Sequence, residues 1–432
     1  MLLNTLEPDF EARFQALLSM KREDAPDVQA TVSEIIADVR ARGDAALLEY
    51  TSRFDRLDLE SPENLIIAKA EIDAAIERVS EAELDALSVA AERIRAYHKR
   101  QIPADDKWTD PTGAMLGWRW TPISAAGLYV PGGLASYPSS VLMNAIPASV
   151  AGVPRLDMVV PTPDGVINPL VLAAAHLSGV TTIYRVGGAQ AVAALAYGTK
   201  TVRPVDKITG PGNAYVAAAK RQVFGKVGID MIAGPSEILV IADGTTDPDW
   251  VAIDLLSQAE HDASAQSILI TTDAAFGNAV ARAVEARLAT LERHEIAGES
   301  WRNNGAIIVV KNLGEAAALT DDIAPEHLEI CVANPGALAD NIAHAGAIFL
   351  GPWTPEAIGD YVGGPNHVLP TARSARFSSG LSVLDFLKRT TIAEMTPGAL
   401  AQIGPAAEIL AKSESLEAHG LSVRARLDRL ND

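Results

Sequence analysis

Residues 182–196 read Thr-Ile-Tyr-Arg-Val-Gly-Gly-Ala-Gln-Ala-Val-Ala-Ala-Leu-Ala. The first five of these residues include the β-branched and aromatic types that favour a strand. Gly187 and Gly188 then make a turn, and the Ala-rich segment that follows is typical of a helix. A strand that leads through a glycine turn into a helix is the repeating unit of α/β proteins, so this stretch predicts that fold class.

The same alternation extends from residue 126 to residue 350. The expected strands are Ala126–Val130, Leu156–Val160, Thr182–Val186, Lys207–Thr209, Glu237–Ala242, Ser267–Thr271, Ala306–Val310, Leu328–Val332 and Ala347–Leu350. The expected helices are Ser140–Val150, Asn168–His176, Ala189–Ala196, Asp249–Glu260 and Phe276–Leu291. This rhythm predicts parallel sheets covered by helices on both faces. Such sheets bind ligands at the carboxyl ends of their strands, where we expect the site.

The segments outside this alternation have a different pattern. Residues 6–102 are expected to be mostly helical, with one helix over residues 81–101, and residues 105–113 are interpreted as a linker. From Leu381 onward we expect no strand, and residues 397–431 are predicted to form amphipathic helices. Such a tail can pack on a partner subunit or on its own body, and the pattern fits both equally.

The composition excludes several kinds of protein. A chain of 432 residues is too long for one ordinary core, and roughly two to four domains are expected. The net charge of −19 argues against a nucleic-acid groove and against binding to an anionic membrane surface. We expect neither a signal peptide nor a membrane span, because the sequence has neither the basic-then-apolar start nor an apolar run of spanning length.

The single cysteine, Cys331, excludes an intramolecular disulfide and a thiolate-rich zinc site. A bound metal would therefore need His, Asp, Glu or amide-oxygen ligands. Gln258 and His261 are candidates because they lie three residues apart at the end of an expected helix, on one face. An amide oxygen and an imidazole that point the same way can bind a metal or a polar substrate.

Three glycine-rich turns favour a nucleotide cleft. Each follows an expected strand and begins a helix: Tyr129–Gly133, Val186–Gln190 and Thr209–Asn213. Backbone amides at helix N-termini bind phosphate, and glycine lets the ligand approach. The dinucleotide fingerprint Gly-x-Gly-x-x-Gly is absent. One such turn alone would be an ordinary connection, but three turns along one sheet favour nucleotide binding.

Glu326 and His327, directly before an expected strand, are a candidate acid–base pair. A neutral imidazole can take a proton near pH 7, and a carboxylate can activate water. On its own, an adjacent Glu and His would more often be a surface feature.

These stretches occur together, in the same order and spacing, in one known family. Over essentially its whole length the chain resembles L-histidinol dehydrogenase. The matching stretches are Tyr129–Gly133, Tyr137–Met143, Gly187–Gln190, Gly210–Tyr215, Asp230–Glu237, Leu256–Asp262, Pro325–Leu328, Asp360–Pro370 and Glu414–His419. The resemblance implies an enzyme that oxidises L-histidinol through L-histidinal to L-histidine with two NAD⁺, the last step of histidine biosynthesis.

The resemblance also implies roles for individual residues. One Zn²⁺ per subunit would be held by Gln258, His261, Asp360 and His419. His327 would take the alcohol proton, and Glu326 would activate water for attack on the aldehyde. The residues implied to bind substrate are Ser236, Gln258, His261, His327, Asp360, His367, Glu414 and His419, and those implied to bind NAD⁺ are Tyr129, Gln190 and Asn213.

Pattern and resemblance together predict two Rossmann-like parallel-sheet domains with a helical N-terminal segment and a helical C-terminal tail. Residues 1–24 are expected to form a helical arm that packs with the C-terminal region. Residues 111–236 are expected to form the nucleotide-binding domain, ending near the turn Gly234-Pro235. Residues 25–110 with 237–381 are expected to carry the metal and catalytic residues. The resemblance implies that the tail, 382–432, crosses over in a cytoplasmic homodimer, so that its Glu414 and His419 complete the partner's site.

Three other functions share part of this pattern. A related zinc and NAD dehydrogenase of another small alcohol, such as a sulfonated diol, should alter the residues that contact imidazole and amine, but His367, Glu414 and His419 are all present. A zinc hydrolase would use Glu326 as base without a nucleotide, which the three glycine turns disfavour. A nonenzymatic scaffold with a structural metal would not need an intact Glu326-His327 pair.

Overall fold

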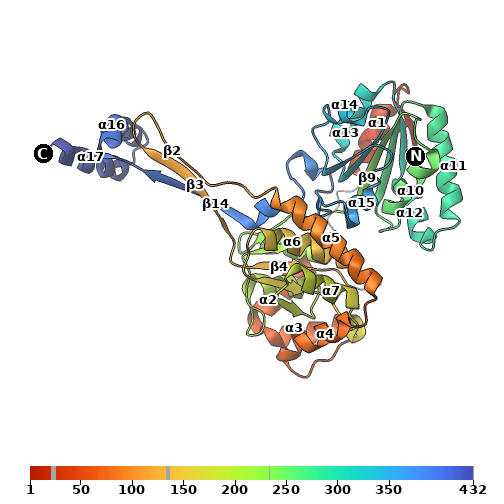
Figure 1. Cartoon of the computed structure of the whole chain (residues 1–432), viewed down its shortest axis with the longest axis horizontal. Coiled ribbons are helices and arrows are strands. Elements are labelled where there is room, and N and C mark those ends of the chain that lie inside the picture. Colours follow the sequence, from red (N-terminus) through yellow and green to blue (C-terminus); the bar gives the residue numbers. More distant parts are fainter. Residues whose placement is uncertain (21–25, 133–136, 233, 432) are drawn as a thin grey trace.

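The computed structural model describes residues 1–20, 26–132, 137–232 and 234–431, and it contains two parallel sheets and an antiparallel ribbon (Figure 1). The predicted α/β class is confirmed. The five-stranded sheet has the order β6-β5-β4-β7-β8 and is parallel throughout. Its strands are β4 (Ala126–Tyr129), β5 (Leu156–Val159), β6 (Thr182–Tyr184), β7 (Lys207–Thr209) and β8 (Gly228–Ile229). Gly133, at the end of the first glycine turn, lies outside the described residues.

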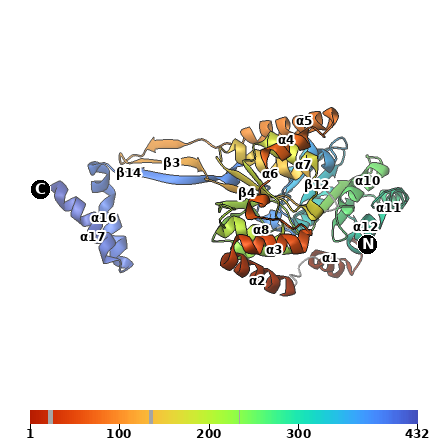
Figure 2. The same ribbon diagram turned by 90° about the horizontal axis from the view of Figure 1, so that it is seen from below.

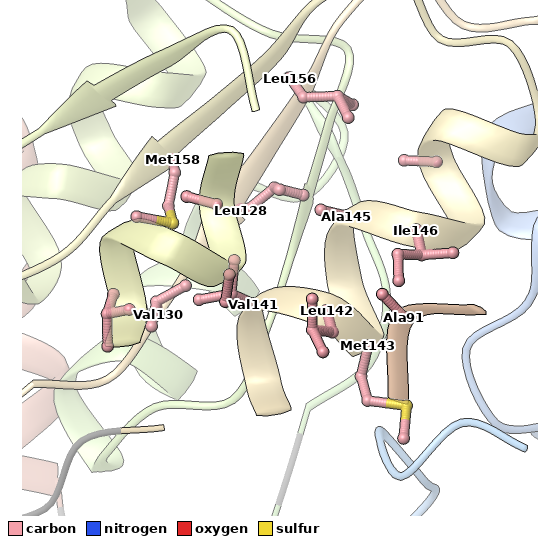
Figure 3. Close-up of a cluster of buried hydrophobic side chains, with 14 of the residues drawn as sticks. Ala91, Leu128, Val130, Val141, Leu142, Met143, Ala145, Ile146, Leu156 and Met158 are labelled. Carbon is pink, nitrogen blue, oxygen red and sulfur yellow. The ribbon is translucent and has the colours of Figure 1, made fainter. Parts of the chain in front are cut away.

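Helices cover both faces of this sheet, because alternate strand residues point to opposite sides. One face packs against α4 (Lys69–Ile76), α5 (Glu81–Lys99), α6 (Pro138–Val150) and α7 (Pro169–Ser178). The other face packs against α2 (Pro26–Arg42), α3 (Asp44–Asp55), α8 (Gly188–Tyr197) and α9 (Ala214–Val223). In Figure 3, Leu128 and Met158 of the sheet lie with Val141 and Leu142 of α6 in the first of these layers.

The packing of α2 to α5 corrects one domain boundary. The sequence predicts that residues 25–110 belong with residues 237–381, but these helices bury their apolar faces on the five-stranded sheet. Val32 and Val39 of α2, for example, lie in the same cluster as Val159 of β5. An amphipathic pattern shows that a helix must cover something, but it does not say which sheet is covered.

The six-stranded sheet has the order β1-β11-β10-β9-β12-β13 and is also parallel. Its strands are β1 (Leu2–Asn4), β9 (Glu237–Ala242), β10 (Gln266–Thr271), β11 (Ala306–Val309), β12 (His327–Cys331) and β13 (Ala347–Leu350). One face is covered by α10 (Pro248–Ala259), α11 (Ala274–Leu288) and α12 (His294–Asn304). The other is covered by α1 (Phe10–Ser19), α13 (Leu313–Ile323) and α14 (Pro335–Ala339).

The N-terminal arm is therefore part of this second sheet. The sequence predicts a wholly helical arm, but the chain starts with β1, which pairs with β11 and buries Leu3. Only then does α1 follow, and it packs on the same sheet. Three residues are too few to show a strand pattern in the sequence. Residues 21–24 of the predicted arm lie outside the described residues.

An antiparallel ribbon connects the body to the tail. It pairs β14 (Leu387–Glu394) with β3 (Met115–Pro122), and β3 with β2 (Asp106–Thr109). These strands correct the predictions of a linker at residues 105–113 and of no strand after Leu381. Every residue of β2 is exposed, and β14 is mostly exposed. Without a buried face, the strands lack the alternation by which a half-buried strand is identified in a sequence.

The predicted helices over residues 397–431 are α16 (Pro397–Ser413) and α17 (Glu417–Asn431), which pack against each other. They lie at the far end of the ribbon, away from both sheets (Figures 1 and 2). Across the described part of the chain, every helix falls short of the length or apolar character that crossing a bilayer requires.

Candidate active site

The predicted catalytic pair lies at the amino edge of the six-stranded sheet. His327 is the first residue of β12 and is in register with Ile238, the second residue of β9. This differs from the expectation of a site at carboxyl strand ends. Gln258 lies near the C-terminus of α10, which follows β9, and Asp360 lies near the C-terminus of α15 (Glu356–Tyr361), which follows β13. Helices that return toward the start of their strands thus carry these side chains to the amino edge.

His327 is held in one orientation by the start of β9. The residue is 3% exposed, and its Nδ1 lies 3.0 Å from the carbonyl oxygen of Glu237. Because a carbonyl can only accept, this contact places the ring proton on Nδ1. Nε2 is buried, has no hydrogen-bond partner among the described residues, and lies 3.7 Å from Oδ1 of Asp360. The ring therefore presents its basic nitrogen to the site.

Glu326 is a buried carboxyl beside this ring. Its Oε2 accepts a hydrogen bond from the backbone N of Glu237 at 2.9 Å and lies 3.7 Å from Nδ1 of His327. Burial raises the pKa of Glu326 to about 7, against the opposing charge of His327. A carboxyl that titrates near pH 7 can both take a proton from water and release it again, as a general base requires.

The charge balance around His327 is negative. Burial alone would lower the pKa of His327, but the carboxylates of Glu326, Glu356 and Asp360 raise it well above its usual value. Burial likewise raises the pKa of Glu356 to about 8, against the opposing charge of His327. The raised pKa values of Glu326 and Glu356 mean that these carboxyls hold protons where a counter-charge is lacking, so a cation that displaces the protons would be favoured.

The carboxamide of Gln258 has one satisfied end and one free end. Gln258 is fully buried, and its Nε2 donates to Oε1 of Glu356 at 2.5 Å and lies 3.2 Å from Nδ1 of His327. Its Oε1 is buried without a hydrogen-bond partner in the described part of the chain. Buried polar atoms normally have a hydrogen-bond partner, so this unpartnered oxygen is a candidate metal ligand.

Asp360 is close to three histidines. Its Oδ1 lies 3.7 Å from Nε2 of His327 and 3.9 Å from Nδ1 of His367. Burial alone would raise the pKa of Asp360, but the nearby imidazoles of His327, His367 and His261 lower it to about 2. Asp360 is therefore a permanent negative charge at neutral pH.

His261 and His367 present neutral imidazoles to this carboxylate. Nδ1 of His367 donates to the backbone carbonyl of Asp360 at 3.1 Å, and burial lowers the pKa of the ring. His261 follows α10 and is exposed as a whole residue, but the surrounding protein atoms lower its pKa, against the charge of Asp360. Neutral imidazole is the form that ligates metals.

This donor set fits a divalent cation with oxygen and nitrogen ligands. His327, Glu356 and Asp360 each offer a ligand atom, and these atoms lie within 4.8 Å of one another. Gln258 adds an Oε1 without a partner among the described residues, and His261 is near enough to Asp360 for the two to affect each other's pKa. Nitrogen and oxygen ligands of this kind suit zinc.

Three buried carboxyls of this site have no role assigned from the sequence: Glu237, Glu329 and Glu356. Glu237 and Glu329 sit inside fully buried strands, 6% and 1% exposed. Charged residues are almost never fully buried without partners, so a lone Glu in an apolar strand is a signal that the sequence does contain. Glu356 carries no such signal, because its short helix follows an irregular turn.

The glycine turns lie at the carboxyl ends of β4, β6 and β7, as predicted. The buried hydroxyl of Tyr129 accepts a hydrogen bond from the backbone N of Gly188 at 2.9 Å, which joins the first turn to the second. A Cβ on Gly210, whose φ is +118°, would lie 2.0 Å from the carbonyl oxygen of Tyr129. Glycine is therefore required at position 210 because the third turn packs directly against the backbone of the first turn.

The remaining candidates are spread over three places. Gln190 lies beside Gly188 and is 3% exposed, with a buried Oε1 that has no partner among the described residues. Asn213 caps α9 by accepting from the backbone N of Tyr215 at 3.1 Å. Ser236 is half-buried directly before β9.

Glu414 and His419 are exposed on the tail, at the far end of the ribbon (Figure 1). A single chain therefore does not bring them to the other candidates. A surface depression of about 390 Å³ lies elsewhere and includes Asp206 and Gly228 in its lining, but none of the candidate residues.

The two sheet units meet beside the site. Nδ2 of Asn366, next to His367, donates to the carbonyl of Met143 in α6 at 2.6 Å. Burial raises the pKa of Tyr361, and Tyr137 at the start of α6 is among the nearby groups that raise it further. The start of α6 follows the first glycine turn, so the carboxyl edge of one sheet lies near the amino edge of the other.

Comparison with known proteins agrees with this geometry. A family model described as histidinol dehydrogenase matches residues 18–427. A histidinol dehydrogenase of Cereibacter sphaeroides is 74% identical over 430 residues, which cover 100% of this chain and 99% of that protein. The chain belongs to the histidinol dehydrogenase family.

Other members of the histidinol dehydrogenase family are similar over the same length. One from Ruegeria pomeroyi is 72% identical over 429 residues, 99% of each chain. The crystal structure of histidinol dehydrogenase from Elizabethkingia anophelis has a TM-score of 0.95 and 38% sequence identity, covering 100% of this chain and 99% of that chain. The family resemblance found in the sequence is confirmed, and the chain is an oxidoreductase.

Proposed function

We propose that this enzyme oxidises L-histidinol through L-histidinal to L-histidine, consuming two NAD⁺, as the last step of histidine biosynthesis. Family membership supports the substrate. The observation that carries the chemistry is the buried pair Glu326 and His327, whose free Nε2 lies 3.7 Å from Asp360. A proton acceptor of this kind beside candidate metal ligands suits the oxidation of a small polar alcohol.

We further propose that Gln258, His261 and Asp360, with His419 of the partner subunit, hold one Zn²⁺ per subunit. The free Oε1 of Gln258 and the permanently charged carboxylate of Asp360 support this. Zinc bound there would hold the imidazole and amine of the substrate in place and lower the pKa of nearby groups. Ser236, His367 and the partner's Glu414 are proposed to contact the same substrate.

His327 would act as base in both oxidations. Its Nδ1 proton is fixed on the carbonyl of Glu237. Once a bound cation offsets the carboxylates that raise the pKa of His327, the deprotonated Nε2 can take the proton of the substrate hydroxyl as hydride leaves for NAD⁺. Glu326 would take a proton from the water that attacks the aldehyde. The resulting gem-diol offers a new hydroxyl, from which His327 takes the second proton. Each such step contributes on the order of 10²–10⁴-fold.

We place NAD⁺ at the glycine turns, with Tyr129, Gln190 and Asn213 as its contacts. The buried, unpartnered Oε1 of Gln190 supports this, because it lies beside the N-terminus of α8. The exposed tail supports a homodimer in which α16 and α17 of each chain reach the partner's site. The cytoplasmic location stays a prediction from the sequence.

Glu326→Gln tests whether Glu326 activates water while His327 takes the proton of the substrate hydroxyl. The amide keeps the shape of the carboxyl but cannot take a proton, so oxidation of L-histidinal should slow more than oxidation of L-histidinol. Single-turnover measurements started from each substrate separate the two half-reactions. Equal slowing of both would rule out a water-activating role for Glu326.

A further inference from the structure

Nε2 of Gln258 contacts two polar side chains, and only Glu356 favours the orientation of the carboxamide, because Nδ1 of His327, 3.2 Å away, carries a proton and cannot accept. Nε2 donates to Oε1 of Glu356 at 2.5 Å, while Oε1 has no partner among the described residues. A bound cation favours the ionised form of Glu356, whose oxygens can only accept, and an amide turned by half a rotation would place its own oxygen against Oε1 of that carboxylate. Glu356 therefore decides which end of the amide faces the proposed metal.

Glu356 is itself fixed by other elements of the fold. It is 2% exposed, and its backbone N donates to Oε1 of Glu329 in β12 at 2.6 Å. Its Oε2 accepts from Oγ of Ser257 in α10 at 3.1 Å. Strand β12, which begins with His327, thus holds Glu356, and Glu356 holds Gln258.

Direct ligation of the metal by Glu356 is the competing explanation. Its carboxyl does lie within 4.8 Å of ligand atoms of His327 and Asp360. Both of its oxygens, however, already accept hydrogen bonds, one from Gln258 and one from Ser257. The free oxygen at this position belongs to Gln258, so ligation by Gln258 leaves every bond of Glu356 intact.

We propose that Glu356 is a positioning residue that holds the carboxamide of Gln258 with its oxygen toward the ion and does not ligate the ion itself. This rests on the proposed zinc site. Groups that orient metal ligands typically change metal affinity by about 10–100-fold when removed.

Two variants separate positioning from ligation. Glu356→Gln keeps an oxygen that accepts from Gln258. Its new NH₂ can donate to Oγ of Ser257 when the single hydroxyl proton of Ser257 turns from residue 356 to the carbonyl of Asp254, 2.7 Å away. Glu356→Asp keeps the charge but is too short to reach Gln258. Zinc affinity, measured by competition with a chromogenic chelator, should stay near the wild-type value for Glu356→Gln and fall about 10–100-fold for Glu356→Asp.

A lower zinc affinity for Glu356→Gln than for Glu356→Asp would overturn the proposal. It would mean that the negative charge at position 356 supports zinc binding and that the contact with Gln258 does not. A double-mutant cycle adds a second test. Once Gln258→Ala has removed the carboxamide, adding Glu356→Asp should cost no further zinc affinity. A further loss comparable to that in the wild-type background would also overturn the proposal.

The same measurements separate this inference from the proposed function. If the wild-type protein takes up no zinc, or if Gln258→Ala binds it as well as the wild type, the proposed metal site fails and this inference fails with it. If both controls behave as expected but Glu356→Asp binds zinc like the wild type, the inference alone fails. Circular dichroism of each variant confirms that the fold is kept.

Discussion

Glu326→Gln should stabilise the zinc-free protein in a way that depends on pH. The carboxyl of Glu326 has a pKa of about 7 in the folded chain, against a usual value of 4.5, because it is buried. The unfolded chain therefore loses this proton first as the pH rises. Between these two values, each rise in pH favours unfolding, and above pH 7 the cost of ionising Glu326 is constant.

The size of the effect follows from the shift. One pKa unit corresponds to about 1.4 kcal/mol, so burial of the ionised carboxyl costs about 3 kcal/mol at pH 8 and about 1 kcal/mol at pH 5. The amide of Glu326→Gln does not ionise and can still accept from the backbone N of Glu237. The free energy of unfolding of the variant should therefore exceed that of the wild type by about 2 kcal/mol more at pH 8 than at pH 5.

Urea unfolding of both proteins in EDTA, at pH 5 and at pH 8, measures this difference as a shift of the midpoint. Glu292→Gln, the same chemical change at an exposed position, is the control and should show no comparable shift. If Glu326→Gln raises the free energy of unfolding equally at the two pH values, or does not raise it at pH 8, then Glu326 is not a carboxyl that ionises at a cost in a buried site.

Two further predictions concern the metal and the tail. His261→Asn should purify without zinc, because a weaker donor replaces an imidazole whose pKa is coupled to that of Asp360; full zinc content by elemental analysis would contradict the ligand role. Mixing the inactive variants Glu326→Gln and His419→Asn should restore about a quarter of wild-type activity after random subunit exchange, because half of the dimers are mixed and each of these has one intact site. No recovery after verified exchange would exclude shared sites.

Nine of the eleven parallel strands that the structure describes could be predicted from the sequence, whereas the short strands β1 and β8 could not. β7, β9 and β13 have the predicted bounds, and the other predicted strands differ by one or two residues at an end. Buried parallel strands are continuous apolar runs between turn residues, so their composition is enough to identify them. The exposed strands β2 and β14 give no such signal, and pairing along the ribbon rather than burial defines them.

Only part of the site could be predicted from the sequence, because its residues come from elements that are far apart in the chain. Gln258 and His261 share a helix end, and Glu326 and His327 are adjacent, so local spacing groups each pair. Their meeting with Asp360 depends on which strands are neighbours, and β9, β12 and β13 are far apart in the sequence. The hydrogen bond between Gln258 and Glu356 joins two helices, and spacing along the chain does not reveal it.

We propose that one site, with Glu326 and His327 as its acid–base pair, carries out both oxidations of L-histidinol. The most direct measurement is the amount of NADH formed per L-histidine when the purified, zinc-loaded protein is given L-histidinol and excess NAD⁺. We predict two NADH for each histidine, with no free aldehyde accumulating. One NADH per substrate with release of L-histidinal, or no NADH at all, would contradict the claim.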